Sequence, residues 1–209
     1  MSLEEMQPGA SIGGGGEKVR ESKKTVITPE FRVSFPCVLR KNKPMSGNAE
    51  DAKYSLTMLF PPGANLQNLF DEVGRAIREE YGADRSNWPK LQNPFRDQGD
   101  KEFEGYEKGA IFITATAKTQ PGLVDASVQK IIDESKFYAG CYAIAEVRAF
   151  CYDAKGKKGV SFGLNNVQKT RDGEPLSGRN APEDVFSPIT PAAGATGGTK
   201  PLTAAELFG

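Results

Sequence analysis

The stretch 140–170, GCYAIAEVRAFCYDAKGKKGVSFGLNNVQKT, decides the fold that this sequence favours. Over 140–153 and again over 158–170, side chains of two kinds alternate along the chain. That period of two is expected of a β-strand with one buried face. The four residues between the segments, Ala-Lys-Gly-Lys, suit a tight turn. The two segments are therefore predicted to pair as a long β-hairpin.

Three earlier segments, 25–40, 52–60 and 110–119, are also rich in β-branched and aromatic residues, and each is predicted to form a strand. Between the second and the third of them, apolar residues recur at helical spacing over 66–81. The polar segment 84–108 that follows contains a Trp-Pro and an Asn-Pro pair and is expected to be a long irregular loop. The pattern thus gives five strands and one helix.

The first of these strands contains two prolines, Pro29 and Pro36. Because proline cannot donate a hydrogen bond to a neighbouring strand, this strand is expected to bend or to lie partly at a sheet edge. Phe31, Val33 and Phe35 fall on one face of it, and we expect all three in the hydrophobic core.

This order of elements favours a mainly β fold: an OB-fold-like five-stranded Greek-key barrel with one helix, a long loop insertion and flexible termini. A β-sandwich is the alternative. The predicted helix follows the second strand rather than the third, which departs from the usual OB arrangement and leaves the strand topology open.

The length of 209 residues corresponds to one domain with extensions at both ends. Residues 1–24, which include a run of four glycines, are predicted to form a flexible N-terminal arm. Residues 177–209 are rich in Pro, Gly, Ala and Thr and are predicted to form a flexible C-terminal tail. The intervening residues, 25–176, are then predicted to form one compact OB-like domain.

The composition excludes several classes of chemistry. Histidine is absent, so the chain contains no Ser-His or Cys-His nucleophile pair and no His-bearing zinc site. The cysteines, Cys37, Cys141 and Cys151, form no Cys-x-x-Cys motif and are expected to be reduced thiols of an intracellular protein. No secretion signal and no membrane span are predicted. We therefore predict no enzyme activity, no catalytic residue, no metal site and no cofactor.

The charges are unevenly distributed, although 27 basic residues balance 27 acidic ones. Residues 136–171 contain seven basic and two acidic side chains, whereas 64–107 contain six basic and ten acidic ones. A polyanion would therefore meet one basic hairpin with acidic flanks. The alternative is that these are ordinary solvated charges.

The faces of two predicted strands suggest what the basic hairpin binds. Along 141–153 the odd positions are small and apolar, as a tight barrel interior requires. The even positions include Tyr142, Arg148, Phe150 and Tyr152, which would then point outward. Along 110–119 the outward set includes Phe112 and Lys118. In the opposite orientation Arg148 would be buried in mid-strand, which is costly.

Aromatic rings interleaved with Lys and Arg on an open strand face form a stacking platform for single-stranded nucleic acid. The lysines at the predicted turn would follow the phosphate backbone. The predicted DNA-binding residues are Phe112, Lys118, Tyr142, Arg148, Phe150, Tyr152, Lys155, Lys157 and Lys158.

Three motifs occur in order along the chain: NWPKLQNPFRDQGD, KGAIFITATAKTQPGLVD and FYAGCYAIAEVRAFCYDAKGKKGVSFGLNNVQKTRDGEPLSGR. In these motifs the chain resembles a family of bacteriophage single-stranded DNA-binding proteins, long catalogued as a domain of unknown function. The resemblance covers roughly 25–186. It implies an OB-fold and non-catalytic coating of single strands during phage DNA replication or recombination, in the cytoplasm of the infected bacterial host.

The leading hypothesis is therefore largely sequence-independent binding of single-stranded DNA. Phage or host replication and recombination proteins are candidate partners of the C-terminal tail, which ends Ala-Glu-Leu-Phe-Gly and is only mildly acidic. Self-association stays open. One alternative is a structural phage adaptor whose aromatic face binds a partner protein. The other is a metal-dependent nuclease that uses the acidic residues Asp97, Asp100, Glu102, Glu104 and Glu107.

Overall fold

The computed structural model describes residues 24–44, 47–154 and 156–176. The predicted C-terminal tail, all of the predicted N-terminal arm except residue 24, and Lys155 lie outside the described residues. No helix in the described part of the chain has the length and apolar character needed to span a bilayer.

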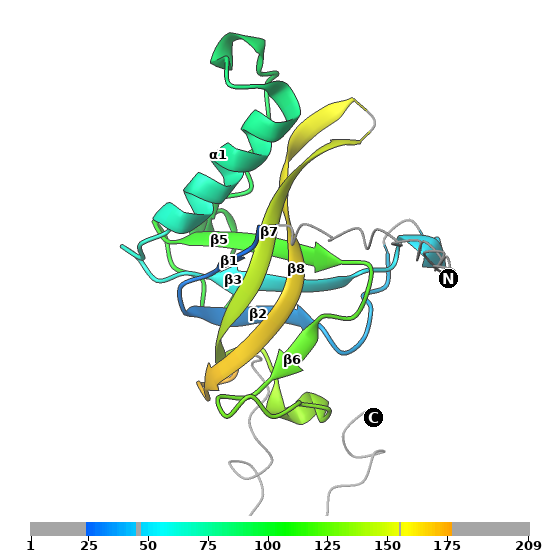
Figure 1. Cartoon of the computed structure of the whole chain (residues 1–209). Helices are drawn as coiled ribbons and strands as arrows, with labels where there is room; N and C mark the ends of the chain where they lie inside the picture. Colours follow the sequence, from blue (N-terminus) through cyan, green and yellow to red (C-terminus); the bar gives the residue numbers. More distant parts are fainter. Residues whose placement is uncertain (1–23, 45–46, 155, 177–209) are drawn as a thin grey trace, which may run out of the picture. The chain divides into compact units, whose positions relative to one another are not determined.

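Eight strands and one α-helix make up the described structure (Figure 1). Four single-turn 3-10 helices lie in the connections. The strands and the helix are β1 (Val26–Ile27), β2 (Phe31–Cys37), β3 (Tyr54–Leu59), α1 (Gln67–Tyr81), β4 (Arg96–Asp97), β5 (Ile111–Ala117), β6 (Gly122–Val124), β7 (Tyr142–Ala154) and β8 (Lys157–Arg171).

Five of these strands close into a barrel. Strand β2 pairs with β3, β3 with β5, β5 with β8, β8 with β7, and β7 returns to β2. All pairs are antiparallel except β5 with β8, which is parallel. The ring corresponds to the five strands predicted from the sequence, and its closure settles the strand order. The β-sandwich alternative is wrong, because one continuous ring replaces two facing sheets.

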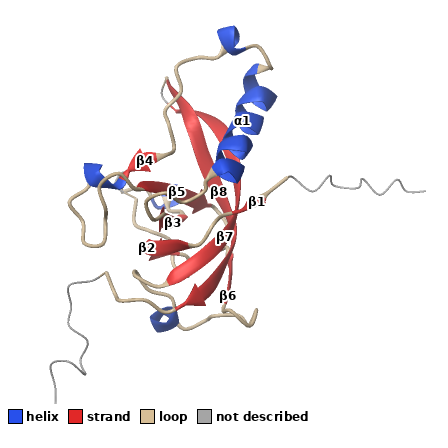
Figure 2. Cartoon of the chain, turned by 90° about the vertical axis from the view of Figure 1, so that its left-hand side faces the viewer, coloured by secondary structure: helices blue, strands red, loops and turns tan. Residues whose placement is uncertain are grey.

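The three short strands attach to this ring. Strand β1 pairs with β7, β4 with β5, and β6 with β8. The sequence analysis merged β1 with β2, and the interruption at Pro29 separates them. It also missed β4, a two-residue strand inside the predicted loop, because so short a segment shows no period. Figure 2 shows β4 beside β5 on the outside of the barrel.

The helix α1 follows β3, as predicted, and packs along β7 (Figure 1). Its buried Glu72 accepts a hydrogen bond from the backbone N–H of Ala149, 3.0 Å away. The guanidinium of Arg75 holds the same carboxylate and also donates to the Ala149 carbonyl at 3.3 Å. Because β1 pairs with β7 only at Val147 and Glu146, these two helix side chains serve the edge of β7 that β1 leaves unpaired.

The orientation predicted for β7 is confirmed. Its small side chains, Ala143, Ala145, Val147 and Ala149, are buried in the core. The even-numbered side chains face outward, and the Phe150 ring is 42% exposed.

The prediction that Phe35 belongs to the core is wrong. Phe31 and Val33 are fully buried, whereas Phe35 is 53% exposed. A β-bulge lies between Ser34 and Cys37, where two residues of β2 stand opposite one of β3. Phe35 has a φ of 45° there. The extra residue breaks the alternation and turns this ring outward.

Candidate nucleic-acid interface

The register of the barrel places a row of outward side chains across its five strands. Ser34 of β2 pairs with Thr57 of β3, and Thr57 pairs with Thr114 of β5. The register of β5 with β8 sets Thr114 beside Ser161, and Ser161 pairs with Phe150 of β7. The row therefore consists of four small hydroxyl residues followed by one exposed aromatic ring. Because the side chains on β5 and β8 are small, a ligand can approach the sheet closely there.

A segment from the long loop covers part of this row. The Ser34 hydroxyl lies 3.2 Å from the Tyr106 hydroxyl, and both Ser34 and Thr57 are buried. Burial raises the pKa of Tyr106, so the phenol stays neutral over the ordinary pH range. The open part of the row is therefore the part on β5, β8 and β7.

A hollow of about 240 Å³ lies over this open part. Its lining residues are Gln92, Asn93, Pro94, Arg96, Thr114, Thr116, Tyr152, Val160 and Ser161. The Tyr152 hydroxyl donates to the Gln92 side-chain oxygen at 2.9 Å, so the loop and β7 meet at one end of the hollow.

Arg96 provides an exposed positive charge at the hollow. Its guanidinium carbon lies 4.5 Å from the centre of the Phe112 ring, and its Nη2 donates to the Thr114 hydroxyl at 3.2 Å. Within the described residues it forms no ion pair with a carboxylate. A guanidinium held over a ring, without an acidic partner, is suited to bind a phosphate.

The aromatic rings of β7 lie over glycines of β8. Tyr152 pairs with Gly159, where a Cβ would stand 2.6 Å from the tyrosine hydroxyl oxygen. Phe150 lies near Gly163, where a Cβ would be 3.9 Å from a ring carbon. The missing side chain at Gly159 therefore gives the Tyr152 ring room to lie against the sheet.

Four of the predicted residues lie together on the hairpin, where Tyr152 lines the hollow. Phe150 and Tyr152 lie on one face of the hairpin, and Lys157 and Lys158 begin its second strand. Lys157 is exposed, whereas the Lys158 ammonium lies 3.7 Å from the Asp153 carboxylate. Lys118 is exposed directly after the end of β5.

The prediction that Phe112 offers an open ring is wrong. Its side chain lies on the predicted outer face but is only 3% exposed. Arg96 covers it, and Tyr106 packs against it with ring centres 5.8 Å apart. The sequence analysis predicted a long irregular loop over 84–108 and did not reveal that part of it folds back over β5.

Arg148 also lies on the outer face, but its charge is directed to α1. Its Nη2 is 3.6 Å from the Glu79 carboxylate, and its Nε is buried with no hydrogen-bond partner among the described residues. The pKa of Glu79 is lowered, chiefly by the hydrogen bond from Arg75. Arg148 thus connects the hairpin to the helix and is not part of the hollow.

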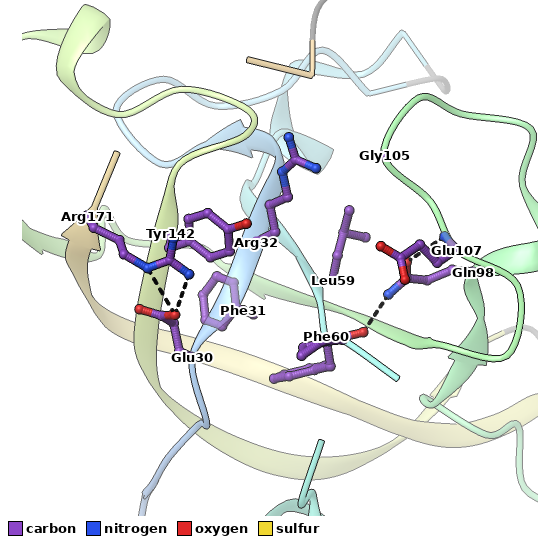
Figure 3. Close-up of a pocket in the computed structure, with 11 residues that line it drawn as sticks. Glu30, Phe31, Arg32, Leu59, Phe60, Gln98, Gly105, Glu107, Tyr142 and Arg171 are labelled. Atoms are coloured by element: carbon purple, nitrogen blue, oxygen red, sulfur yellow. Dashed lines mark hydrogen bonds and ion pairs between the residues drawn. The ribbon is translucent and has the colours of Figure 1, made fainter. Parts of the chain in front are cut away.

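Tyr142 lies at the other end of β7, ten residues from Tyr152 and therefore about 33 Å away along the strand. Figure 3 shows it in a separate pocket of about 270 Å³. The Arg171 guanidinium carbon lies 3.3 Å from the centre of its ring, and Glu30 accepts from Arg171 at 2.8 Å. The hydrogen bond from Arg171 is the main reason that the pKa of Glu30 is lowered. The structure therefore does not place Tyr142 with the hairpin residues.

Of the residues that line the hollow, the sequence analysis predicted Tyr152 and missed the others, including Gln92 and Arg96. Nothing in the local pattern pairs Arg96 with Phe112, since that contact depends on how the loop folds. The glycine under Tyr152 did carry a signal, because a hairpin paired about 154–157 matches Tyr152 to Gly159.

The described residues show no arrangement for metal binding: no three Asp, Glu or Cys side chains gather as a ligand set. The three cysteines are free thiols. Burial raises the pKa of Cys141 and of Cys151, which disfavours the thiolate form of both. What the site offers is a neutral, hydroxyl-lined floor with aromatic and cationic borders.

The family described as Enterobacter phage Enc34, ssDNA-binding protein, matches residues 24–196, most of the chain. The chain belongs to this family. The putative protein p50 of Acyrthosiphon pisum secondary endosymbiont phage 1 is 30% identical over 159 residues, which cover 70% of this chain and 83% of that protein. The resemblance inferred from the three motifs is confirmed.

Solved structures support the fold. The single-stranded DNA-binding protein from bacteriophage Enc34, in complex with ssDNA, aligns with a TM-score of 0.59 at 20% identity and covers 73% of this chain and 89% of that one. The single-stranded DNA-binding protein gp2.5 of bacteriophage T7 aligns with a TM-score of 0.57 at 15% identity, over 83% of this chain and all of that one. The OB-fold-like architecture is therefore shared with phage proteins of this kind.

Proposed function

We propose that this protein binds single-stranded DNA over the outer face of β5, β8 and β7, without catalysis and with little sequence preference. Its family is that of a phage ssDNA-binding protein, which supports a role in DNA replication or recombination in the cytoplasm of an infected bacterium. The observation that carries the proposal is the exposed Phe150 ring at the end of a row of hydroxyl side chains. One hydroxyl of this row, that of Thr114, accepts from Arg96, which has no carboxylate partner among the described residues.

The bases would stack on Phe150 and Tyr152. Stacking on the face of a ring involves no base-specific hydrogen-bond pattern, so any base can be accepted. The floor beneath is formed by Thr114, Ser161 and Gly163, whose side chains are too small to hinder a flat ligand.

The phosphates would meet the positive charges of this face. These are Arg96, which lines the hollow, Lys118 directly after β5, and Lys157 and Lys158 of the hairpin. Lys155 is assigned the same role from the sequence. In this proposal Phe112 supports Arg96 from below and Arg148 holds α1 to the hairpin. Neither contacts the DNA directly.

Fluorescence titration with oligo-dT tests the stacking residues. Phe150→Ala combined with Tyr152→Ala should weaken binding by about 5- to 150-fold for each base that loses its ring. Ile132→Ala, an exposed apolar substitution at a residue outside the hollow, serves as the matched control. Unchanged affinity in the folded double variant would remove these rings from the site.

The salt dependence tests the charges separately. Log affinity should fall linearly with log salt, by about 0.7 for each phosphate neutralised, and Arg96→Gln should reduce that slope by about one such step. A gel shift with and without Mg²⁺ addresses the alternatives. Shortening of the DNA with Mg²⁺ would indicate a nuclease, and no retention at low salt would indicate a protein adaptor.

A further inference from the structure

Two half-exposed phenylalanines lie side by side at β2, outside the hollow. Phe35 is 53% exposed and Phe103 is 51% exposed. Their ring centres are 5.4 Å apart and their planes meet at 72°. The two rings therefore form an open corner in which a flat ligand can lie on one face and touch the edge of the other ring.

One of these rings is held in solvent by a strained backbone conformation. Phe35 has a φ of 45°, in the left-handed region that residues other than glycine rarely occupy. The following residue, Pro36, has no N–H to donate to β3, and the bulge lies at this point. Strain of this kind at an exposed aromatic residue points to a role for the ring outside the core.

A continuous line of aromatic contacts joins this corner to the hollow. Phe103 packs on Tyr106 with ring centres 5.5 Å apart, and Tyr106 packs on Phe112 at 5.8 Å. Arg96 lies over Phe112. The corner therefore lies at the β2 end of the row of outward side chains, and Phe150 lies at the β7 end of that row. Four spacings between neighbouring strands separate those two ends, roughly 19 Å around the barrel.

A second arginine lies near this corner. Arg32 donates to the carbonyls of Gly140 and Glu174, and among the described residues it forms no ion pair with a carboxylate. Its Nη1 lies 3.4 Å from the position a Cβ would take on Gly105, two residues from Phe103. A ring pair beside a guanidinium without an acidic partner repeats the chemistry found at the hollow.

We propose that Phe35 and Phe103 form a second base-stacking station on the path of the single-stranded DNA, with Arg32 meeting a phosphate there. This inference rests on the proposed function and extends it from one end of the row to the other. A pair of aromatic rings with an arginine nearby matches a nucleobase and its phosphate better than the apolar core of a protein interface.

The experiment compares oligo-dT of about four and about sixteen nucleotides, the limits of OB-fold site size. The variants are Phe35→Gly, Phe103→Ala and the control Ile132→Ala. Phe35→Gly should bind the short oligonucleotide as the wild type does and the long one about 5- to 150-fold more weakly, the loss expected for one stacked base. Its thermal midpoint should equal or exceed that of the wild type, because glycine accepts the positive φ.

Phe103→Ala leaves the β2 backbone untouched and should show the same loss for the long oligonucleotide only. A 2-aminopurine base placed along the long oligonucleotide should lose its quenching at one position in each variant. The second station is overturned if the wild type binds both oligonucleotides and neither variant has a lower affinity for the long one. Absence of binding by the wild type itself would instead overturn the proposed function.

Discussion

Two glycines of β8 lie near the rings of β7, but only Gly159 limits how closely a ring approaches the sheet. At Gly159 a Cβ would stand 2.6 Å from the Tyr152 hydroxyl oxygen and 2.9 Å from the Gln92 Cβ. At Gly163 the nearest atoms would be 3.6 Å and 3.9 Å away, which is ordinary contact. Replacing each glycine with alanine therefore distinguishes the effect of moving the Tyr152 ring from the general effect of adding a methyl group to the strand.

We predict that Gly159→Ala weakens binding of oligo-dT, whereas Gly163→Ala does not. The added methyl group must displace the Tyr152 ring and break its hydrogen bond to Gln92, so a stacking contribution of about 1–3 kcal/mol is reduced or lost. Fluorescence titration of both variants checks this. Equal affinities of the two variants would show that the position of the Tyr152 ring does not matter for binding.

At the scale of elements, the period of two predicted the five barrel strands because it depends only on which face of each strand is buried. The same period predicted that Phe150 faces outward and the alanines of β7 face inward. It failed at Phe35, where one extra residue in a bulge reverses the face. It also failed to show that Phe112 is covered, because the covering side chain, Arg96, is sixteen residues away in a loop whose path follows from tertiary contacts.

Helix α1 supplies hydrogen-bond partners to the edge of β7 at Ala149, which no strand covers. We expect Glu72→Ala to lower the free energy of unfolding by about 1–3 kcal/mol, because the Ala149 N–H would be left buried without an acceptor. Urea unfolding measures the change. Glu80→Ala, at an exposed position of the same helix, should stay within about 0.5 kcal/mol of the wild type. Equal effects of the two substitutions would contradict this role of Glu72.

At the scale of the whole molecule, two carboxylates hold neighbouring parts of the barrel together. Glu30, just before β2, accepts from Arg171 and Thr170 at the end of β8. Glu146 of β7 accepts from Thr25 and from Asn166 of β8. The pKa of each is lowered: that of Glu30 chiefly by the Arg171 hydrogen bond, and that of Glu146 chiefly by the Thr25 hydrogen bond. Both contacts join segments distant in sequence, which sequence alone does not reveal.

These lowered pKa values make the barrel sensitive to acid. A carboxylate with a lower pKa in the folded chain stabilises the fold at any pH above its unfolded pKa, about 4.3 for glutamate. That contribution is lost as the pH falls through the folded pKa, so the thermal midpoint should decrease between about pH 5 and about pH 3. Glu146→Gln should have a lower midpoint than the wild type at neutral pH and a smaller decrease in acid. Glu80→Gln is the control, since that exposed residue makes none of these contacts. Melting curves over this range measure the difference, and parallel profiles for Glu146→Gln and the wild type would show that the Glu146 contacts do not contribute to the acid sensitivity.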